Sequence, residues 1–294
     1  MHRTRNLSGS VLDGVGLRLL AVFLLTAMSA AVREASQTVP VGQIVFVRSA
    51  LALLPILLWL RWRHGLRAGL TTERPAAHLL RGLLGAVSIT LSFISLAALP
   101  VTSAKALSYL APVLSVPLAA MVLRERVGAA ALVALAVALA GTAAMLHGAL
   151  VLPGPGAAIG IAAGLGFALT MAVVRVLVRD MTRTEAPAAI AASMAAISAL
   201  CALLSLPFGW VMPEGGAWVS LLATGLLGGF AAIAGTEAIA RAPVAALAPV
   251  EYSGLVWALL FDVLLFATLP DRWALAGAGL ILVAALIVTL RGAR

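Results

Sequence analysis

Charged residues and cysteine are both scarce in this chain. Of its 294 residues, 11% are charged and 63% are hydrophobic, and the mean hydropathy is +1.10. A soluble domain carries about 25% charged residues, so this composition excludes a water-soluble fold. The one cysteine, Cys201, lies within an apolar run. It excludes a disulfide framework and a cysteine-rich metal site.

Motifs for catalysis, metal binding and nucleic-acid binding are also missing. The chain has no H-E-x-x-H and no G-x-S-x-G motif, and its four histidines do not pair at ligand spacing. We therefore predict no enzyme activity, no metal site and no cofactor. The net charge is +9, but arginines stand in short clusters between apolar stretches, whereas a nucleic-acid-binding domain gathers them on one solvated face. We predict no nucleic-acid partner.

Apolar runs of about 20 residues, long enough to cross a bilayer core of roughly 30 Å, fill most of the chain. They cover residues 14–34, 42–61, 76–99, 102–123, 127–147, 155–177, 186–207, 217–240, 243–266 and 272–291. With the N-terminus in the cytoplasm, most arginines fall in cytoplasmic connectors, as the positive-inside rule requires. We therefore predict an all-α polytopic protein with ten transmembrane helices. It is predicted to be a multi-pass protein of the bacterial cytoplasmic (inner) membrane, with both termini cytoplasmic.

The sequence also repeats itself. The word GLLG occurs at 82–85 and again at 225–228, an offset of 143 residues. Each copy leads to a Pro-Val pair, and a tyrosine follows nine residues after each of those prolines. These residues, Tyr109 and Tyr252, are the only tyrosines in the chain. A weaker repeat pairs MSAAVR in the first span with TMAVVR in the sixth, at an offset of 142.

The repeat divides the chain into two five-helix halves, residues 1–147 and 148–294. Because five is an odd number, the second half must begin on the opposite side of the membrane. We therefore predict two inverted five-helix repeats. Secondary transporters are built in this way and move one repeat-derived unit against the other around a midplane site.

Several stretches resemble a known family. PVTSAKALSYLAPV leads into the fourth span, LRERVG closes it, and the second span, VPVGQIVFVRSALALLPILL, contains an arginine. Together with the ten spans, they resemble the EamA-type branch of the drug/metabolite transporter superfamily, and most of all YddG-type exporters of aromatic amino acids. The resemblance implies a central cavity lined by spans one, three, four, six, eight and nine, with spans five and ten as peripheral supports. The second half lacks a counterpart of Glu125.

Candidate site residues are ionisable or aromatic residues within the spans. Glu251 lies about 12 Å into the ninth span and is the candidate for proton coupling. Lys105 and Tyr109 lie four residues apart on one helix face, where an ammonium beside a phenol could hold a carboxylate. The guanidinium of Arg48 suits a carboxylate of the cargo or of a structural partner. The other predicted cargo contacts are Tyr252, Trp257, Phe93 and Phe167, and Pro112 and Pro117 are predicted to bend the fourth span and act in gating.

A structural role stays open beside each functional one. Glu251 could hydrogen-bond inside the bundle without titrating, Lys105 could reach the outer surface, and each phenol could bond a neighbouring helix. Interfacial water is expected to solvate Asp262 near the outer boundary. The other expectations are an ion pair between Glu237 and Arg241, access of Arg18 and Arg81 to the inner surface, and close helix contacts at glycines spaced by four.

The function predicted from these features is secondary transport. The cargo is a small amphipathic metabolite, with amino acids, and aromatic ones in particular, as the favoured class. It is exported by alternating access around a midplane cavity, with protons as the candidate coupling ion and the lipid bilayer as the surroundings. An uptake permease or facilitator, a passive channel and an intramembrane enzyme stay open as alternatives.

Overall fold

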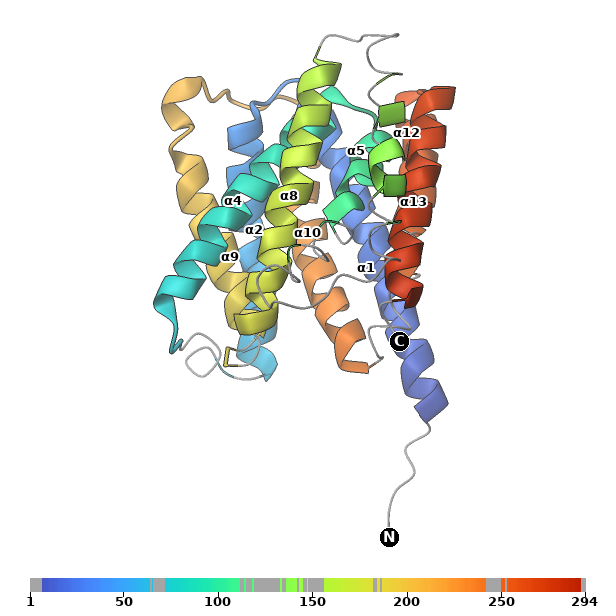
Figure 1. Cartoon of the computed structure of the whole chain (residues 1–294). Coiled ribbons are helices and arrows are strands. Elements are labelled where there is room, and N and C mark those ends of the chain that lie inside the picture. Colours follow the sequence, from blue (N-terminus) through green and yellow to red (C-terminus); the bar gives the residue numbers. More distant parts are fainter. Residues whose placement is uncertain are drawn as a thin grey trace.

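The computed structural model is a bundle of helices (Figure 1). It describes residues 7–63, 65, 72–111, 114, 118, 133, 136–141, 143, 144, 147, 156–181, 184, 185, 187–241, 250, 251 and 253–291. The helices are α1 (Leu7–Ala35), α2 (Val41–Arg63), α4 (Pro75–Ala98), α5 (Val101–Ser108), α8 (Ala157–Met181), α9 (Pro187–Leu203), α10 (Gly216–Arg241), α12 (Ser253–Phe266) and α13 (Arg272–Arg291), with a 3-10 turn, η1 (Leu206–Phe208). No strand occurs among these described residues, so the all-α prediction is confirmed.

Five of these helices are long and apolar enough to cross a membrane. The qualifying stretches are Asp13–Ala35, Val41–Trp62, Pro75–Ala98, Ala157–Arg175 and Gly216–Ala238, while α9, α12 and α13 hold shorter apolar stretches. The fold is that of a polytopic membrane protein, as predicted. Most of the predicted span 127–147 lies outside the described residues. Its residues 136–141 are helical, and a Cβ on Gly141 would lie 2.8 Å from the carbonyl oxygen of Gly277 in α13.

The predicted fourth span differs from a single regular helix. Helix α5 ends at Ser108, Tyr109 forms a turn with φ −74° and ψ −5°, and the chain is helical again at Leu110. Pro112 follows Ser108 by four residues, the spacing at which a proline ring collides with a helical carbonyl. Pro112 and Pro117 themselves lie outside the described residues, so their gating role stays a prediction.

Helix contacts repeat when the two halves are exchanged. If the first half supplies α1, α2, α4 and α5, the equivalent helices of the second are α8, α9, α10 and α12. Helix α1 packs against α10 as α8 packs against α4, and α2 packs against α10 as α9 packs against α4. Likewise α1 packs against α12 as α8 packs against α5. Each pair joins one half to the other, so the halves interlock.

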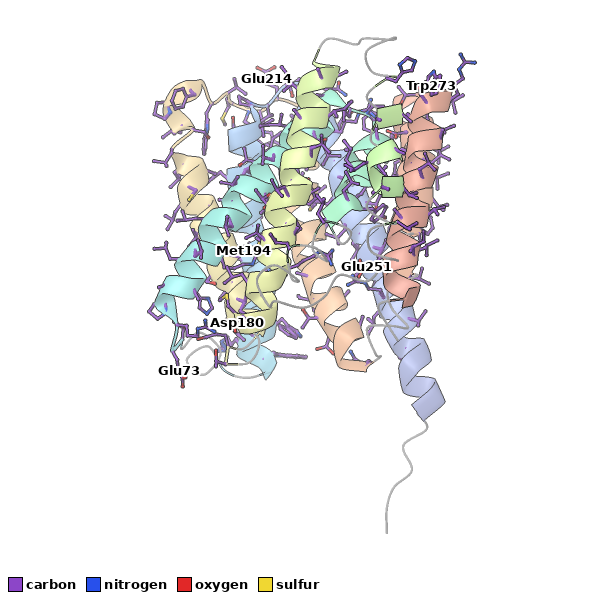
Figure 2. The ribbon with its side chains drawn as sticks, in the orientation of Figure 1. Glu73, Asp180, Met194, Glu214, Glu251 and Trp273 are labelled. Atoms are coloured by element: carbon purple, nitrogen blue, oxygen red, sulfur yellow. The ribbon has the colours of Figure 1, made fainter. Side chains whose placement is uncertain are left out.

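Equivalent helices also run in opposite directions. Glu73, just before α4, and Glu214, just before α10, lie at opposite ends of the bundle (Figure 2). Arg74 of the α2–α4 connector forms an ion pair with Asp180 at 2.8 Å, so this connector and the one between α8 and α9 share one end. We call it the basic end, because the charge pattern assigned both arginine-rich connectors to one side. This is the arrangement that inverted halves require.

The GLLG repeat allows close approach between the halves. A Cβ on Gly82 of α4 would lie 2.4 Å from Cδ1 of Ile197 in α9. A Cβ on Gly225 of α10 would lie 2.3 Å from the Cβ of Leu51 in α2. Since α9 and α2 are equivalent helices, the same contact is made twice. The repeated glycines are therefore explained by backbone approach.

A polar side chain holds the connector that precedes α10. Gln43, near the start of α2, donates from Nε2 to the carbonyl oxygen of Val211 at 2.8 Å. Its Oε1 accepts from the N–H of Val211 at 3.0 Å. We call this arrangement the Gln43 clamp. It fixes the chain between α9 and α10 at the end opposite the basic end.

The equivalent position in the second half carries a carboxylate. Glu185 follows Gln43 by 142 residues and holds the connector that precedes α4. Its Oε1 accepts from the Thr72 hydroxyl at 3.0 Å and from the N–H groups of Glu73 and Arg74, both at 3.1 Å. Its Oε2 lies 3.1 Å from Nε2 of His78. We call this the Glu185 clamp.

The surroundings of Glu185 act on its pKa in opposite directions. Burial of the carboxyl raises the pKa, while the hydrogen bonds from His78, Thr72 and the Glu73 amide lower it and outweigh the burial. The pKa of Glu185 is therefore held below its ordinary value. A carboxyl with a lowered pKa contributes stability above its unfolded-state pKa, and that contribution is lost as the pH falls through the folded-state pKa.

The close contact of α10 with α2 can be tested at Gly229. A Cβ there would lie 2.3 Å from Cγ of Pro55 and 3.2 Å from the carbonyl oxygen of Ala52. We expect Gly229→Ala to lower the free energy of unfolding by about 1–3 kcal/mol through overpacking. Thermal melts of the detergent-solubilised protein measure this. Gly279→Ala is the matched control, because a Cβ on Gly279 meets nothing within 4 Å; equal melting of both variants would contradict the close approach.

The Glu185 clamp gives a pH-dependent prediction. We expect Glu185→Gln to melt below the wild type at pH 7, and the gap to close as the pH falls below about 4, near the ordinary pKa of glutamate. Melts of nanodisc-embedded protein between pH 8 and pH 3.5 measure the gap. Glu214→Gln, on an exposed carboxylate, serves as the control. A gap that widens in acid is the result that contradicts the assignment.

Candidate functional site

The predicted site centres on the crossing of α5 with α12. The N–H groups of Val101 and Thr102 at the start of α5 donate to the two carboxylate oxygens of Asp262 near the end of α12, at 2.8 and 2.7 Å. Just after the end of α5, the Tyr109 hydroxyl donates to the carbonyl oxygen of Glu251 at 2.9 Å. The start of one helix thus meets the end of its equivalent. The two run antiparallel, and Tyr109 and Glu251 lie at one depth.

Tyr109 joins the two halves. Its hydroxyl bonds the backbone of the other half, and a Cβ on Gly254 would come within 2.7 Å of it. This is the structural role that the sequence left open for a phenol. Contact with cargo stays a prediction for Tyr109, and Tyr252 lies outside the described residues.

Glu251 forms an ion pair with Arg18 of α1, a partner that the sequence did not assign. The guanidinium of Arg18 is held by this carboxylate, and the access of Arg18 to the inner surface stays a prediction. The Glu251 side chain keeps 32% of its surface exposed. Its role in proton coupling stays a prediction. The structure adds that Arg18 is the cation whose ion pair with Glu251 a proton would break.

Asp262 is buried, contrary to expectation. Its side chain is 0% exposed and forms an ion pair at 2.7 Å with Arg33, which also lies over the ring of Phe266 at 4.4 Å from the centroid. The expectation that interfacial water solvates Asp262 is therefore wrong, because Arg33 and the N–H groups of Val101 and Thr102 satisfy its carboxylate. The sequence contained a signal for both ion pairs, because Arg18 and Arg33 lie on the first span and Glu251 and Asp262 lie on the ninth.

Five other charged residues from the sequence analysis lie in the described helices. Glu237 pairs with Arg241, as predicted. Arg81 is 8% exposed, so the expectation that it reaches the inner surface is wrong; its Nη2 lies 3.3 Å from Sδ of Met194. The side chains of Arg48 and Lys105 make no hydrogen bond or ion pair with any residue in the described part of the chain.

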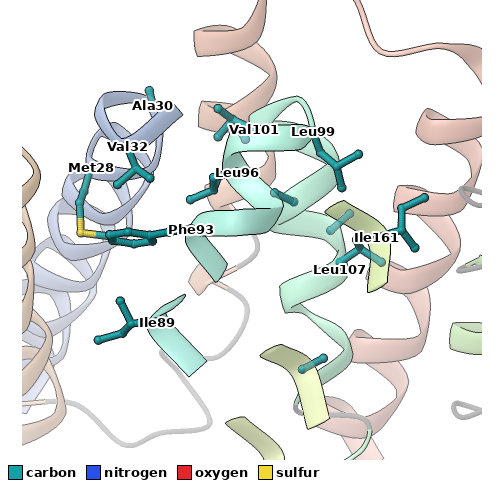
Figure 3. Packing of buried hydrophobic residues seen from close by; sticks show 14 of the residues in the cluster. Met28, Ala30, Val32, Ile89, Phe93, Leu96, Leu99, Val101, Leu107 and Ile161 are labelled. Carbon is teal, nitrogen blue, oxygen red and sulfur yellow. The ribbon is translucent and has the colours of Figure 1, made fainter. Parts of the chain in front are cut away.

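The predicted aromatic contacts lie within packed surroundings. Phe93 is 2% exposed and lies against Met28 (Figure 3). Trp257 packs edge-on against Phe23 with ring centroids 5.1 Å apart, and its buried Nε1 has no hydrogen-bond partner. Phe167 on α8 is half-buried. Phe93 and Trp257 thus stabilise helix packing in this structure, and cargo contact stays a prediction for all three.

A cavity of about 480 Å³ lies between α2, α4 and α9. Its lining is mostly apolar and includes Thr90, Ser198 and Cys201, but none of the predicted site residues. Leu83 and Val87 in its wall are 44% and 49% exposed, so it opens sideways, toward lipid. We therefore distinguish it from a midplane site. Among the described residues, no group of three or more histidines, cysteines or carboxylates could hold a metal ion.

The family model that matches this chain and several relatives similar to it in sequence all describe transporters. The EamA-like transporter family model matches residues 12–146 and 156–290. The pseudopaline exporter CntI of two Pseudomonas aeruginosa strains is 28% identical over 284 residues, which cover 94% of this chain and 96% of the exporter. An uncharacterized transporter of Helicobacter pylori is 26% identical over 288 residues, 96% of each chain.

A solved crystal structure shares the fold. It superposes with a TM-score of 0.66 over 98% of this chain and 99% of its own, at 24% identity, which is evidence for the fold alone. None of the relatives above is named for aromatic amino acids. The resemblance to that group of exporters therefore stays a prediction.

The Arg33–Asp262 pair predicts a large effect on stability. Asp262→Asn leaves the Arg33 charge without its partner, so we expect a loss of about 3–5 kcal/mol in the free energy of unfolding. Denaturant titration of the purified protein measures the loss, with Glu214→Gln as the control. The double variant Arg33→Gln/Asp262→Asn should recover part of it. Additive losses would contradict a direct pair.

Proposed function

The chain belongs to the EamA-like transporter family, and we propose that it is a secondary transporter that exports small amphipathic metabolites across the cytoplasmic membrane. Amino acids, aromatic ones first, are the proposed cargo. The transporter alternates access to a midplane site between its two halves. Both termini are proposed to lie in the cytoplasm, which makes the basic end the cytoplasmic end.

The antiparallel crossing of α5 and α12 carries this proposal. Equivalent segments of two halves meet there side by side, through Tyr109 and Glu251. When two inverted units share a contact at mid-depth, a movement that opens one end closes the other around that contact. A site at the crossing can then face each side of the membrane in turn.

The proposed direction of transport rests on the relatives. Two of them bear the name of an exporter and match nearly the whole chain. A common fold does not fix the cargo, so their named cargo is not transferred to this chain. Export is the direction we propose to test first.

Glu251 is proposed to couple a proton to this cycle. Its carboxylate holds Arg18, so α1 and α12 are linked when Glu251 is charged. Protonation removes the charge that attracts the guanidinium, and the link weakens. The Glu251 side chain is 32% exposed, and we propose that protons reach it through this exposed part.

Lys105 is proposed to hold the cargo carboxylate. It lies one helical turn before Tyr109 on α5, and no described carboxylate neutralises it. An ammonium in low-dielectric surroundings gains most from a counter-charge. A cargo carboxylate supplies one, while the apolar body of the cargo lies against the helices.

Flux measurements in proteoliposomes test the function. We expect radiolabelled phenylalanine to be carried in a saturable way and to be driven by a proton gradient. Glu251→Gln should lose the gradient dependence, and Lys105→Ala should raise KM roughly tenfold through loss of a charge-assisted hydrogen bond. Glu214→Gln should behave as the wild type.

Two results would count against the proposal. Absence of saturable flux over a broad panel of amino acids would rule out amino acids as the cargo class. Full gradient dependence in Glu251→Gln would remove the proton role and leave transport in place.

A further inference from the structure

The buried charges of the bundle do not balance. Three described carboxylates of the bundle each have a cationic partner: Glu251 with Arg18, Asp262 with Arg33, and Glu237 with Arg241. Asp13 and Glu34, near the two ends of α1, are exposed. Among the described residues, Arg48, Arg81 and Lys105 have no ion-pair partner. The interior therefore holds positive charge that the described chain leaves unneutralised.

The part of the chain outside the described residues does not supply the missing carboxylate for the outer cations. Of the 11 acidic residues, only Glu125 lies there. The positive-inside pattern predicts Glu125, which stands between Arg124 and Arg126, at the basic end. Arg48 and Lys105 lie toward the opposite end.

Arg48 and Arg81 each lie beside the last glycine of a GLLG copy, Arg48 from a neighbouring helix and Arg81 from the same helix. A Cβ on Gly228, the last glycine of the second GLLG, would lie 3.3 Å from Nε of Arg48 and 3.0 Å from Sδ of Met28. A Cβ on Gly85, the last glycine of the first GLLG, would lie 2.7 Å from Nη1 of Arg81. Each copy of the repeat therefore leaves space for a guanidinium.

Both guanidinium groups have donors without acceptors. Nε and Nη1 of Arg81 are buried without a partner, and Nε of Arg48 is too. A buried donor left unpaired costs free energy, and an unpaired charge costs more. Water could satisfy the N–H groups, but it would leave the charge uncompensated in a low-dielectric interior. An anion accepts hydrogen bonds from the N–H groups and also neutralises the charge.

The two arginines lie at matching depths from opposite ends. Arg48 follows the start of α2, Val41, by seven residues, or about 10 Å of rise. Arg81 follows the start of α4, Pro75, by six residues, or about 9 Å. Because α2 starts opposite the basic end and α4 starts at it, each half of the membrane thickness contains one of them.

We propose that Arg48 and Arg81 are two anion-binding subsites, one toward each face of the membrane, that receive a carboxylate of the cargo in turn. The cargo is then a carboxylate-bearing molecule, as the amino acids proposed above are. This deepens the function proposed above and rests on it. Arg81 receives the carboxylate at the basic end, and Arg48 receives it before release at the opposite end.

A charge series of one cargo body tests the proposal. N-acetylphenylalanine is an anion, phenylalanine a zwitterion and phenylalaninamide a cation. Binding is measured by thermal shift in dodecyl maltoside without phospholipid. We expect N-acetylphenylalanine to bind best. Arg48→Gln and Arg81→Gln should each weaken its binding roughly 30-fold or more, and Arg272→Gln, on an exposed arginine, should not.

The variants also separate binding from a structural role. Because each removes an unpaired buried charge, both should melt at or above the wild-type temperature without ligand; Arg48→Met and Arg81→Met repeat the test with an apolar chain. In proteoliposomes of uniform orientation, Arg81→Gln should raise KM from the basic end and Arg48→Gln from the opposite end. Melting well below the wild type would indicate structural arginines and overturn the proposal.

The remaining outcomes are equally decisive. Unchanged binding of N-acetylphenylalanine in both variants, while the wild type still transports phenylalanine, overturns the subsites and keeps the transporter. If phospholipid added without cargo stabilises the wild type but not Arg81→Gln, Arg81 binds a lipid headgroup, and the proposal of two alternating cargo subsites fails. If none of the three compounds binds or moves, the subsites and the proposed amino-acid cargo fail together.

Discussion

The fully buried carboxylate of Asp262 holds one side of this bundle together. Asp262 of α12 neutralises Arg33 of α1 and accepts two backbone N–H groups at the start of α5. Where solvent cannot satisfy a charge, the chain must do so. One side chain therefore fixes three helices from both halves. The antiparallel crossing that brings Tyr109 to Glu251 begins at this point, so the geometry of the candidate site depends on it.

The halves are equivalent in contact pattern but not in chemistry. Ion pairs join α1 to Asp262 of α12 and to Glu251 just before α12, whereas the equivalent helices α8 and α5 meet through an apolar contact. A Cβ on Gly164 of α8 would lie 2.6 Å from Cδ1 of Leu107 in α5, so this glycine leaves room for the leucine side chain. Separating α1 from α12 exposes charges, and separating α8 from α5 exposes apolar surface. In lipid the second costs less, so the α8–α5 contact is the easier of the two to change.

Sequence reasoning reached the fold because membrane constraints act on long stretches. Apolar length, arginine placement and an odd number of spans per half predicted the helices and their opposite directions. The pair within one helix, Glu237 with Arg241, was predicted, but partners on different helices were beyond it, since Asp262 was expected in interfacial water and Arg81 at the surface. A sequence gives depth along a helix but not rotation about its axis. Arg33 and Asp262 meet only because α1 and α12 turn those faces toward each other.

The clamps show the same division between shared geometry and distinct chemistry. Gln43 and Glu185 occupy equivalent positions and hold equivalent connectors, yet one is a neutral amide and the other a charged carboxylate beside His78. Hydrogen bonds to a charged acceptor are about twice as strong as neutral ones. The connector before α4 is thus held more firmly than the connector before α10. Two identical clamps would hold both connectors equally, so the difference between Gln43 and Glu185 favours movement of the connector before α10.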